Sequence, residues 1–176
     1  MRRNIIASFG DNLLEFVAIL CYNGKKRGDK MIVTFCGHSN LFGSEAISLK
    51  LEAVLRNLIA EGADSFLLGG YGGFDSMAAL VVRKLKKESP QIRAILVIPY
   101  LDRKFNTDLY DDSIYPPIEN APRKFAISRR NEWMVNRSDV VVSYVQYGWG
   151  GAAATLRYAE RKKKRIISIV EDPMSS

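Results

Sequence analysis

The chain has 176 residues, 47% of them apolar, and carries 26 Lys and Arg against 19 Asp and Glu, a formal charge of +7 at pH 7. This length and composition are typical of one globular domain, and no apolar run approaches the roughly 18 residues of a transmembrane helix. Two cysteines and one histidine are too few for a disulfide framework or for the usual zinc clusters. We therefore expect a cytoplasmic protein with no membrane association, no metal site and no cofactor.

The first thirty residues differ from the rest of the chain, because they are rich in turn formers and basic residues near their end. We expect residues 1–30 to form a peripheral extension and residues 31–176 to form a single Rossmann-like nucleotide-binding domain. Two alternatives remain open for the extension. It could be a secretory signal with Arg2 and Arg3 in its basic region, or the natural protein could start at Met31.

From residue 31 onward, apolar runs alternate with helical periodicities. Strands are predicted at 31–36, 65–69, 92–98, 139–145 and 165–170. Helices are predicted at 44–61, 75–88, 122–136 and 151–164. This alternation predicts an α/β fold, a Rossmann-like three-layer sandwich with a mainly parallel five-stranded sheet. The segment 99–122 is long for a loop and could be a lid or an ordered packing loop.

Two helices show clear apolar stripes. The helix at 44–61, with Ser44 as its expected N-cap and Gly62 after its end, is predicted to bury Ile47, Leu51, Val54, Leu55, Leu58 and Ile59. The helix at 75–88 is predicted to bury Met77, Leu80, Val81 and Leu85.

Ligands of open parallel sheets bind beyond the carboxyl ends of the strands. After the first strand, Gly37 would permit close approach of a ligand, while His38 and Ser39 would donate to it. The alternative is a simple turn with a capping side chain.

A glycine-rich segment follows the second strand. Gly69, Gly70, Gly72 and Gly73, with Tyr71 between them, have no evident packing purpose and cost conformational entropy. We expect their amides to approach an anionic ligand at the start of the next helix. Asp75 would repel a phosphate, so it should cap that helix or bind a ribose hydroxyl.

A second small-residue segment follows the fourth strand, and Gly150, Gly151, Ala152 and Thr155 are its expected ligand-binding residues. The preceding helix carries two further candidates. Arg130 could bind a phosphate in a bidentate manner, with Asn131 beside it.

These segments together resemble a known superfamily. The residues that carry the resemblance are 69–75, 126–134, Ser138-Asp139 and 150–155, followed by Tyr158-Ala159. They resemble the SLOG superfamily, which joins the DNA-processing protein A and LOG-like Rossmannoid families, and most of all its small bacterial members of the DUF1273 type. The resemblance implies nucleotide binding at the glycine loops.

The resemblance also bears on catalysis. LOG enzymes hydrolyse the N-glycosidic bond of nucleoside 5′-monophosphates, and Arg130 matches their catalytic arginine. Their motif glutamate is missing, because Arg157 and Tyr158 stand in its region. Asp75 or Glu132 could supply the carboxylate that such hydrolysis needs.

Three functions follow from this pattern. The first is binding of a nucleotide or sugar phosphate by the glycine loops and Arg130. The alternatives are N-glycosidase activity on a nucleoside 5′-monophosphate, with Arg130, Asp75 and Glu132 as catalytic candidates, and single-stranded nucleic-acid binding, which the basic charge favours only weakly. The resemblance further implies a homo-oligomer.

Overall fold

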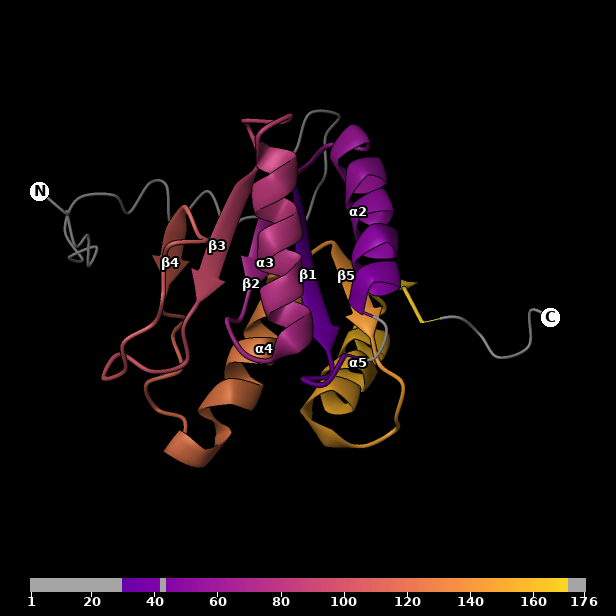
Figure 1. The fold of residues 1–176 in the computed structure, drawn as a ribbon. Helices are drawn as coiled ribbons and strands as arrows, with labels where there is room; N and C mark the ends of the chain where they lie inside the picture. Colours follow the sequence, from indigo (N-terminus) through magenta and orange to yellow (C-terminus); the bar gives the residue numbers. More distant parts are fainter. Residues whose placement is uncertain (1–29, 42–43, 171–176) are drawn as a thin grey trace, which may run out of the picture.

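The computed structural model describes residues 30–41 and 44–170, in which strands and helices alternate (Figure 1). The strands are β1 (Met31–Gly37), β2 (Ala63–Leu68), β3 (Arg93–Val97), β4 (Asp112–Ile114), β5 (Val140–Tyr144) and β6 (Arg165–Ser168). The helices are α2 (Ser44–Ala60), α3 (Gly73–Lys86), α4 (Ala126–Arg137) and α5 (Gly150–Arg161), and a 3-10 turn (Arg123–Phe125) precedes α4.

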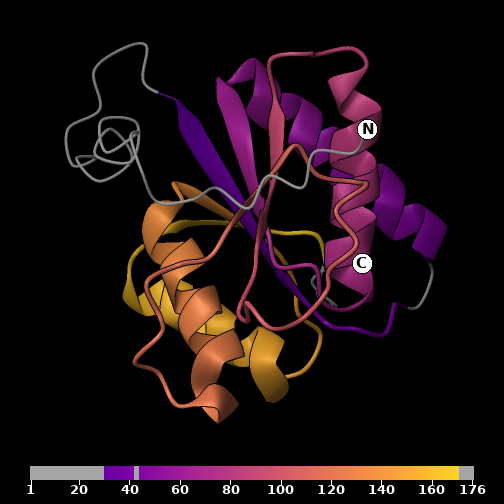
Figure 2. The same cartoon turned by 90° about the vertical axis from the view of Figure 1, so that its left-hand side faces the viewer.

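The strands form one parallel sheet in the order β4-β3-β2-β1-β5-β6. Helices α2 and α3 cover one face and α4 and α5 cover the other, so the sheet is the middle of three layers (Figure 2). Because both faces are covered, the central strands are apolar along their length, and every residue of β5 is buried. The predicted Rossmann-like fold class is confirmed.

The winding of the chain brings the two glycine-rich segments together. It proceeds from β1 outward to β4, then crosses back to β5 on the other side of β1. The carboxyl ends of β2 and β5 therefore flank the end of β1, where Gly37 is in register with Tyr144. Such a switch in strand order is where ligands of this fold class bind.

The sheet has one strand more than predicted, because β4 lies inside the segment 99–122. Its start is fixed by Asp111, whose amide donates to the carbonyl of Ala94 at 2.8 Å and whose carboxylate accepts from the Ala94 amide at 2.8 Å. Lys86 forms an ion pair with the same carboxylate. Three residues, two of them polar, produce no apolar run, so no local pattern indicates this edge strand.

The apolar stripe of α2 was predicted well, since Ile47, Leu51, Leu55 and Leu58 are buried, while the predicted Val54 and Ile59 are only partly so. The stripe of α3 was predicted less well. Leu80 is 57% exposed and Met77 is partly buried, and the helix instead buries Phe74, Ala78, Ala79, Val81, Val82 and Leu85. The helix begins at Gly73, two residues before the predicted start, and Phe74 thereby becomes part of its buried face.

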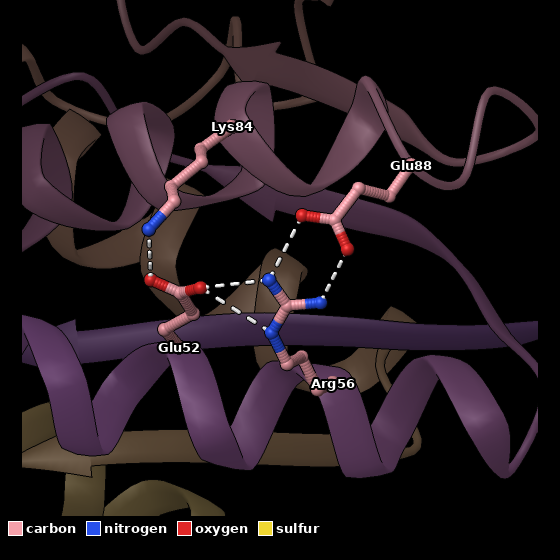
Figure 3. A network of polar contacts seen from close by, with 4 residues as sticks. All are labelled: Glu52, Arg56, Lys84 and Glu88. Atoms are coloured by element: carbon pink, nitrogen blue, oxygen red, sulfur yellow. Dashed lines mark hydrogen bonds and ion pairs between the residues drawn. The ribbon is translucent and has the colours of Figure 1, made fainter.

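An ion-pair network joins α2 to α3 (Figure 3). Arg56 donates to Glu88 at 2.6 Å and to Glu52 at 2.8 Å, and Lys84 donates to Glu52 at 2.7 Å. Hydrogen bonds from Lys84 and Arg56 hold the pKa of Glu52 below its usual value. The network lies at the surface and is screened by salt, so it aligns the two helices more than it stabilises the fold.

Most of the predicted extension, residues 1–29, lies outside the described residues, and with it both alternatives for that segment. Within the described ranges, no helix combines the length and the apolar character needed to cross a membrane.

Candidate functional site

A cavity of about 150 Å³ lies over the carboxyl end of β1, between the β2–α3 loop and the starts of α4 and α5. It brings together nine of the predicted site residues, which come from the end of β1, the β2–α3 loop and α3, α4 and α5. These are Gly37, Gly69, Tyr71, Asp75, Arg130, Asn131, Gly151, Ala152 and Thr155. The two glycine-rich segments thus border one shared space, as the sequence predicts.

The other predicted residues are not among those that line the cavity: His38, Ser39, Gly70, Gly72, Gly73, Gly150 and Glu132. The carbonyl of Ser39 accepts a hydrogen bond from the Gly73 amide at 3.0 Å, which ties the β1–α2 loop to the start of α3. The Nε2 of His38 accepts from the Tyr147 amide at 3.1 Å. Glu132 forms an ion pair with Arg129 at 2.9 Å.

The four glycines of the β2–α3 loop have packing roles, so the prediction that they have none was wrong. A β-carbon on Gly69 would lie 2.4 Å from Nη1 of Arg130, and one on Gly73 would lie 2.3 Å from the carbonyl oxygen of Ser39. Gly70 and Gly72 have φ angles of +72° and +85°, which favour glycine. Their partners come from distant parts of the chain, which is why the segment alone could not reveal them.

Asp75 fills the amide cradle that the sequence assigned to a ligand. Its Oδ2 accepts from the Tyr71 amide at 2.9 Å, and the amides of Gly69 and Gly70 also stabilise its charged form. Burial nevertheless raises the pKa of Asp75, against the opposing effects of these amides and of Arg130. The contact with the Tyr71 amide joins Asp75 to the β2–α3 loop and not to an amide of the first turn of α3, which has no side-chain cap, so the expected helix cap is not formed.

Arg130 is the largest fully buried side chain among the described residues, only 2% exposed. Its Nη1 donates to the carbonyls of Gly69 and, at 2.7 Å, Val97. Its Nε has no hydrogen-bond partner among the described residues, although it is buried. Burial lowers the pKa of Arg130 while the charge of Asp75 opposes this, and a guanidinium remains cationic in proteins.

The first turn of α5 contains no acidic residue, in contrast to the first turn of α3, which contains Asp75. Trp149 precedes the helix in an extended conformation, and no side chain caps the first turn. The first amides of a helix have no acceptor within it and carry the positive end of its dipole. Gly151 and Ala152 line the cavity at this point.

Thr155 and Asn131 connect α5 to α4 beside the same cavity. The Thr155 hydroxyl donates to the carbonyl of Gly151 at 2.8 Å and accepts from the Asn131 amide group at 3.1 Å. Both side chains are thus engaged within the protein, and they fix the position of the α5 start relative to Arg130.

Sequence reasoning missed the apolar lining of the cavity and two aromatic neighbours. Phe35, Cys36, Phe74, Ile127 and Met134 also line the cavity. Burial raises the pKa of the Cys36 thiol to about 12. These five apolar residues lie near the end of β1 or on the helices α3 and α4, so in the sequence they have the pattern of core residues.

The two aromatic neighbours come from the segment 99–122. The ring of Phe105 lies 5.9 Å from that of Tyr71. Burial and the nearby Asp75 raise the pKa of Tyr110 to about 12. The segment that contains β4 therefore packs against the β2–α3 loop of the site.

Comparison with solved structures shows the same fold in proteins of low sequence identity. DNA processing protein A from Helicobacter pylori, described as binding single-stranded DNA, superposes with a TM-score of 0.57 at 20% identity, covering 83% of this chain and 68% of that one. The molybdenum cofactor binding protein of Rippkaea orientalis superposes with a TM-score of 0.58 at 19% identity, covering 83% and 80%.

Among curated proteins, the chain is similar to the SPbeta prophage-derived protein YoqJ of Bacillus subtilis strain 168. The two are 29% identical over 137 residues, 64% of this chain and 79% of YoqJ. The family model YpsA matches residues 39–165, a range that includes the β2–α3 loop, Arg130 and the start of α5. The resemblance to SLOG proteins of the DUF1273 type is confirmed: the chain belongs to the family described as the YspA SLOG family.

Proposed function

We propose that the cavity over β1 binds a nucleotide or sugar phosphate, with the phosphate at the start of α5. The observation that carries the proposal is that two groups with positive charge or partial positive charge lie beside the same cavity. The uncapped first turn of α5 and Arg130 border the same cavity of the described residues, and the Nε of this buried arginine has no hydrogen-bond partner among them. Amides of a helix start and a desolvated guanidinium both favour a phosphate.

The sequence suggested that both glycine-rich segments and Arg130 hold the phosphate, and the proposal keeps only the α5 start and Arg130. The amide of Tyr71 is already bound by the carboxylate of Asp75, and that of Gly73 is bound by Ser39. A phosphate at the β2–α3 loop would also meet the charge of Asp75 at close range. The α5 start has neither obstacle, so the phosphate belongs there and the β2–α3 loop faces the sugar.

Asp75 suits the sugar for a chemical reason. An ionised carboxylate accepts hydrogen bonds at both oxygens, and Asp75 lines the cavity while its Oδ2 binds the Tyr71 amide. Ribose hydroxyls are donors of the kind that such an oxygen accepts. The structural neighbours support the choice of ligand class, because one is described as binding DNA and another as binding the molybdenum cofactor.

The test measures binding of the four common nucleoside 5′-monophosphates, ribose 5-phosphate and adenosine by isothermal titration calorimetry. We expect the phosphorylated compounds to bind and adenosine to bind at least tenfold more weakly. If no nucleotide or sugar phosphate binds at millimolar concentration, the proposal is wrong.

Gly151→Asp gives a sharper version of this test. A β-carbon at Gly151 meets no atom within 4 Å, so the substitution fits the fold. An acidic residue in the first turn stabilises a helix, yet here it would repel a phosphate. We expect a loss of affinity of tenfold or more for ribose 5-phosphate with no loss of stability, and Gly151→Asn as the uncharged control should lose much less.

Hydrolysis of the N-glycosidic bond is a second candidate, and one observation favours it. Asp75 is the one acidic residue lining the cavity among the described residues, and burial raises its pKa toward the range useful for acid–base catalysis. Glu132, Arg157 and Tyr158 lie outside the cavity lining. Release of free base from a monophosphate, abolished by Asp75→Asn, would support this activity, and absence of base release from all four would refute it.

A further inference from the structure

Two aromatic side chains are stacked on the surface beside the start of α5. Trp149 is 73% exposed and Tyr147 is 45% exposed. Their ring centroids are 5.7 Å apart and their planes differ by 20°. The His38 ring continues the group at 5.1 Å from Tyr147. We call Tyr147 and Trp149 the aromatic pair.

The loop that carries the aromatic pair is held in place without covering the rings. The Tyr147 amide donates to Nε2 of His38 at 3.1 Å, and Nη1 of Arg157 donates to the Gly148 carbonyl at 2.8 Å. Exposed apolar area of this kind is unfavourable in water. A loop that is fixed by polar contacts while its rings stay exposed offers a preformed face for another flat group.

The cavity alone is too small for a nucleotide. Its volume of about 150 Å³ is well below the roughly 300–1,000 Å³ of pockets that enclose a small-molecule ligand. It has room for a phosphate and part of a sugar, so the base must lie outside the rim. Trp149 lies two residues before Gly151, the first residue of α5 that borders the cavity, so its Cα lies within about 7 Å of that of Gly151.

We propose that the aromatic pair is the base-binding surface of this site, which makes the ligand a nucleoside 5′-phosphate with its base stacked on Trp149 outside the cavity. This rests on the phosphate position proposed above. An aromatic face accepts any base, so the surface favours large purines over pyrimidines by contact area and does not read hydrogen-bonding edges.

The experiment uses Trp149 as both reporter and target. The chain has two tryptophans, Trp133 and Trp149, so Trp133→Phe leaves a single reporter at the site. In that background we expect AMP and GMP to quench the fluorescence, because a stacked base quenches an indole, and ribose 5-phosphate to bind without quenching.

The affinity measurement compares Trp149→Ala with the otherwise unchanged chain. Stacking on one aromatic residue is worth about 5- to 140-fold in affinity. We expect a loss of this size for AMP and GMP and less than a twofold change for ribose 5-phosphate. Trp149→Phe should retain most of the affinity, and Leu49→Ala, which removes a similarly exposed apolar side chain (63%) from α2, should change nothing.

Three outcomes would overturn the inference. Equal affinity of the Trp149→Ala variant and the parent for AMP would show that the base does not contact the ring, while phosphate binding would still stand. Equal losses for AMP and ribose 5-phosphate would show a structural effect. Binding of single-stranded oligonucleotides without binding of mononucleotides would assign the aromatic pair to nucleic acid instead.

Discussion

The guanidinium of Arg130 occupies the space that a side chain at position 69 would need. A β-carbon built on Gly69 lies 2.4 Å from Nη1 and 2.7 Å from Cζ of that arginine. The Gly69 carbonyl at the same time accepts a hydrogen bond from Nη1. Gly69, directly after β2, and Arg130 of α4 therefore pack against each other as one unit at the edge of the sheet.

Substitution of Gly69 by alanine should therefore cost stability. We expect about 1–3 kcal/mol in the free energy of unfolding, measured by urea denaturation, because a buried and hydrogen-bonded guanidinium has little room to move. Gly148→Ala is the matched control, since a β-carbon there meets no atom within 4 Å, and its effect should stay below about 0.5 kcal/mol. Equal stability of the two variants would contradict the packing unit.

Removal of the Arg130 charge should be more costly still. Arg130→Met leaves the carbonyls of Gly69 and Val97 without this donor and the Asp75 carboxylate without its buried cation. Breaking such a buried arrangement costs about 3–5 kcal/mol. Arg129→Met changes a side chain that is 60% exposed, and it should alter urea stability by less than about 0.5 kcal/mol. A loss below about 1 kcal/mol for Arg130→Met would argue against the structural role.

The partly buried carboxyl of Asp75 should give the protein a characteristic pH dependence. Its pKa is raised above the ordinary value of 3.8, so the folded state binds its proton more tightly than the unfolded state does. The stability that this provides is complete below pH 3.8 and is lost as the pH rises through the folded-state value.

Asp75→Asn isolates this contribution, because asparagine keeps an oxygen acceptor for the Tyr71 amide. The unfolding free energy of the parent minus that of the Asp75→Asn variant should fall as the pH rises from about 4 to about 7 in urea titrations. A difference that rises over this range would mean that the carboxylate is net stabilised in its charged form.

Cys36 should be a slow thiol. Burial raises its pKa from 9.0 to about 12, which lowers the thiolate fraction at pH 8 roughly a thousandfold before access is considered. In a Cys21→Ser background, Ellman's reagent should react slowly with the native protein and quickly in denaturing urea. Because Cys36 lines the cavity, AMP should slow the native reaction further, whereas rapid labelling of the folded protein would contradict the described burial.

The fold could be predicted from the sequence where burial imposes a simple pattern. Strands covered on both faces appear as uninterrupted apolar runs, and these located β1, β2, β3, β5 and β6. The edge strand β4 has one partly covered residue in its three positions, and its pairing depends on Asp111 and Ala94, which lie seventeen residues apart. Such long-range polar contacts leave no local trace.

The candidate site was predictable in its location but not in its internal roles. The carboxyl ends of all strands of a parallel sheet lie at one edge, and this placed the two glycine-rich segments there. Two contacts decide which segment has free amides. The Asp75 carboxylate accepts a hydrogen bond from the Tyr71 amide, and the Ser39 carbonyl accepts one from the Gly73 amide. The spacing of the glycines does not distinguish the segment before α3 from the one before α5. In the structure, Asp75 of α3 binds an amide of the first segment, whereas the first turn of α5 contains no acidic residue.

The two rims of the cavity should consequently tolerate change very differently. At the β2–α3 rim, glycines lie in close contact with Arg130 and Ser39, so a substitution there lowers the stability of the fold before it changes ligand binding. At the opposite rim, Gly148 and Gly151 have free space where a side chain would be. Diversification of ligand preference among descendants of this scaffold is thus expected at positions 147–149 and 151, where new side chains can be accommodated without unfolding the protein, and not at Gly150, whose φ of +86° favours glycine.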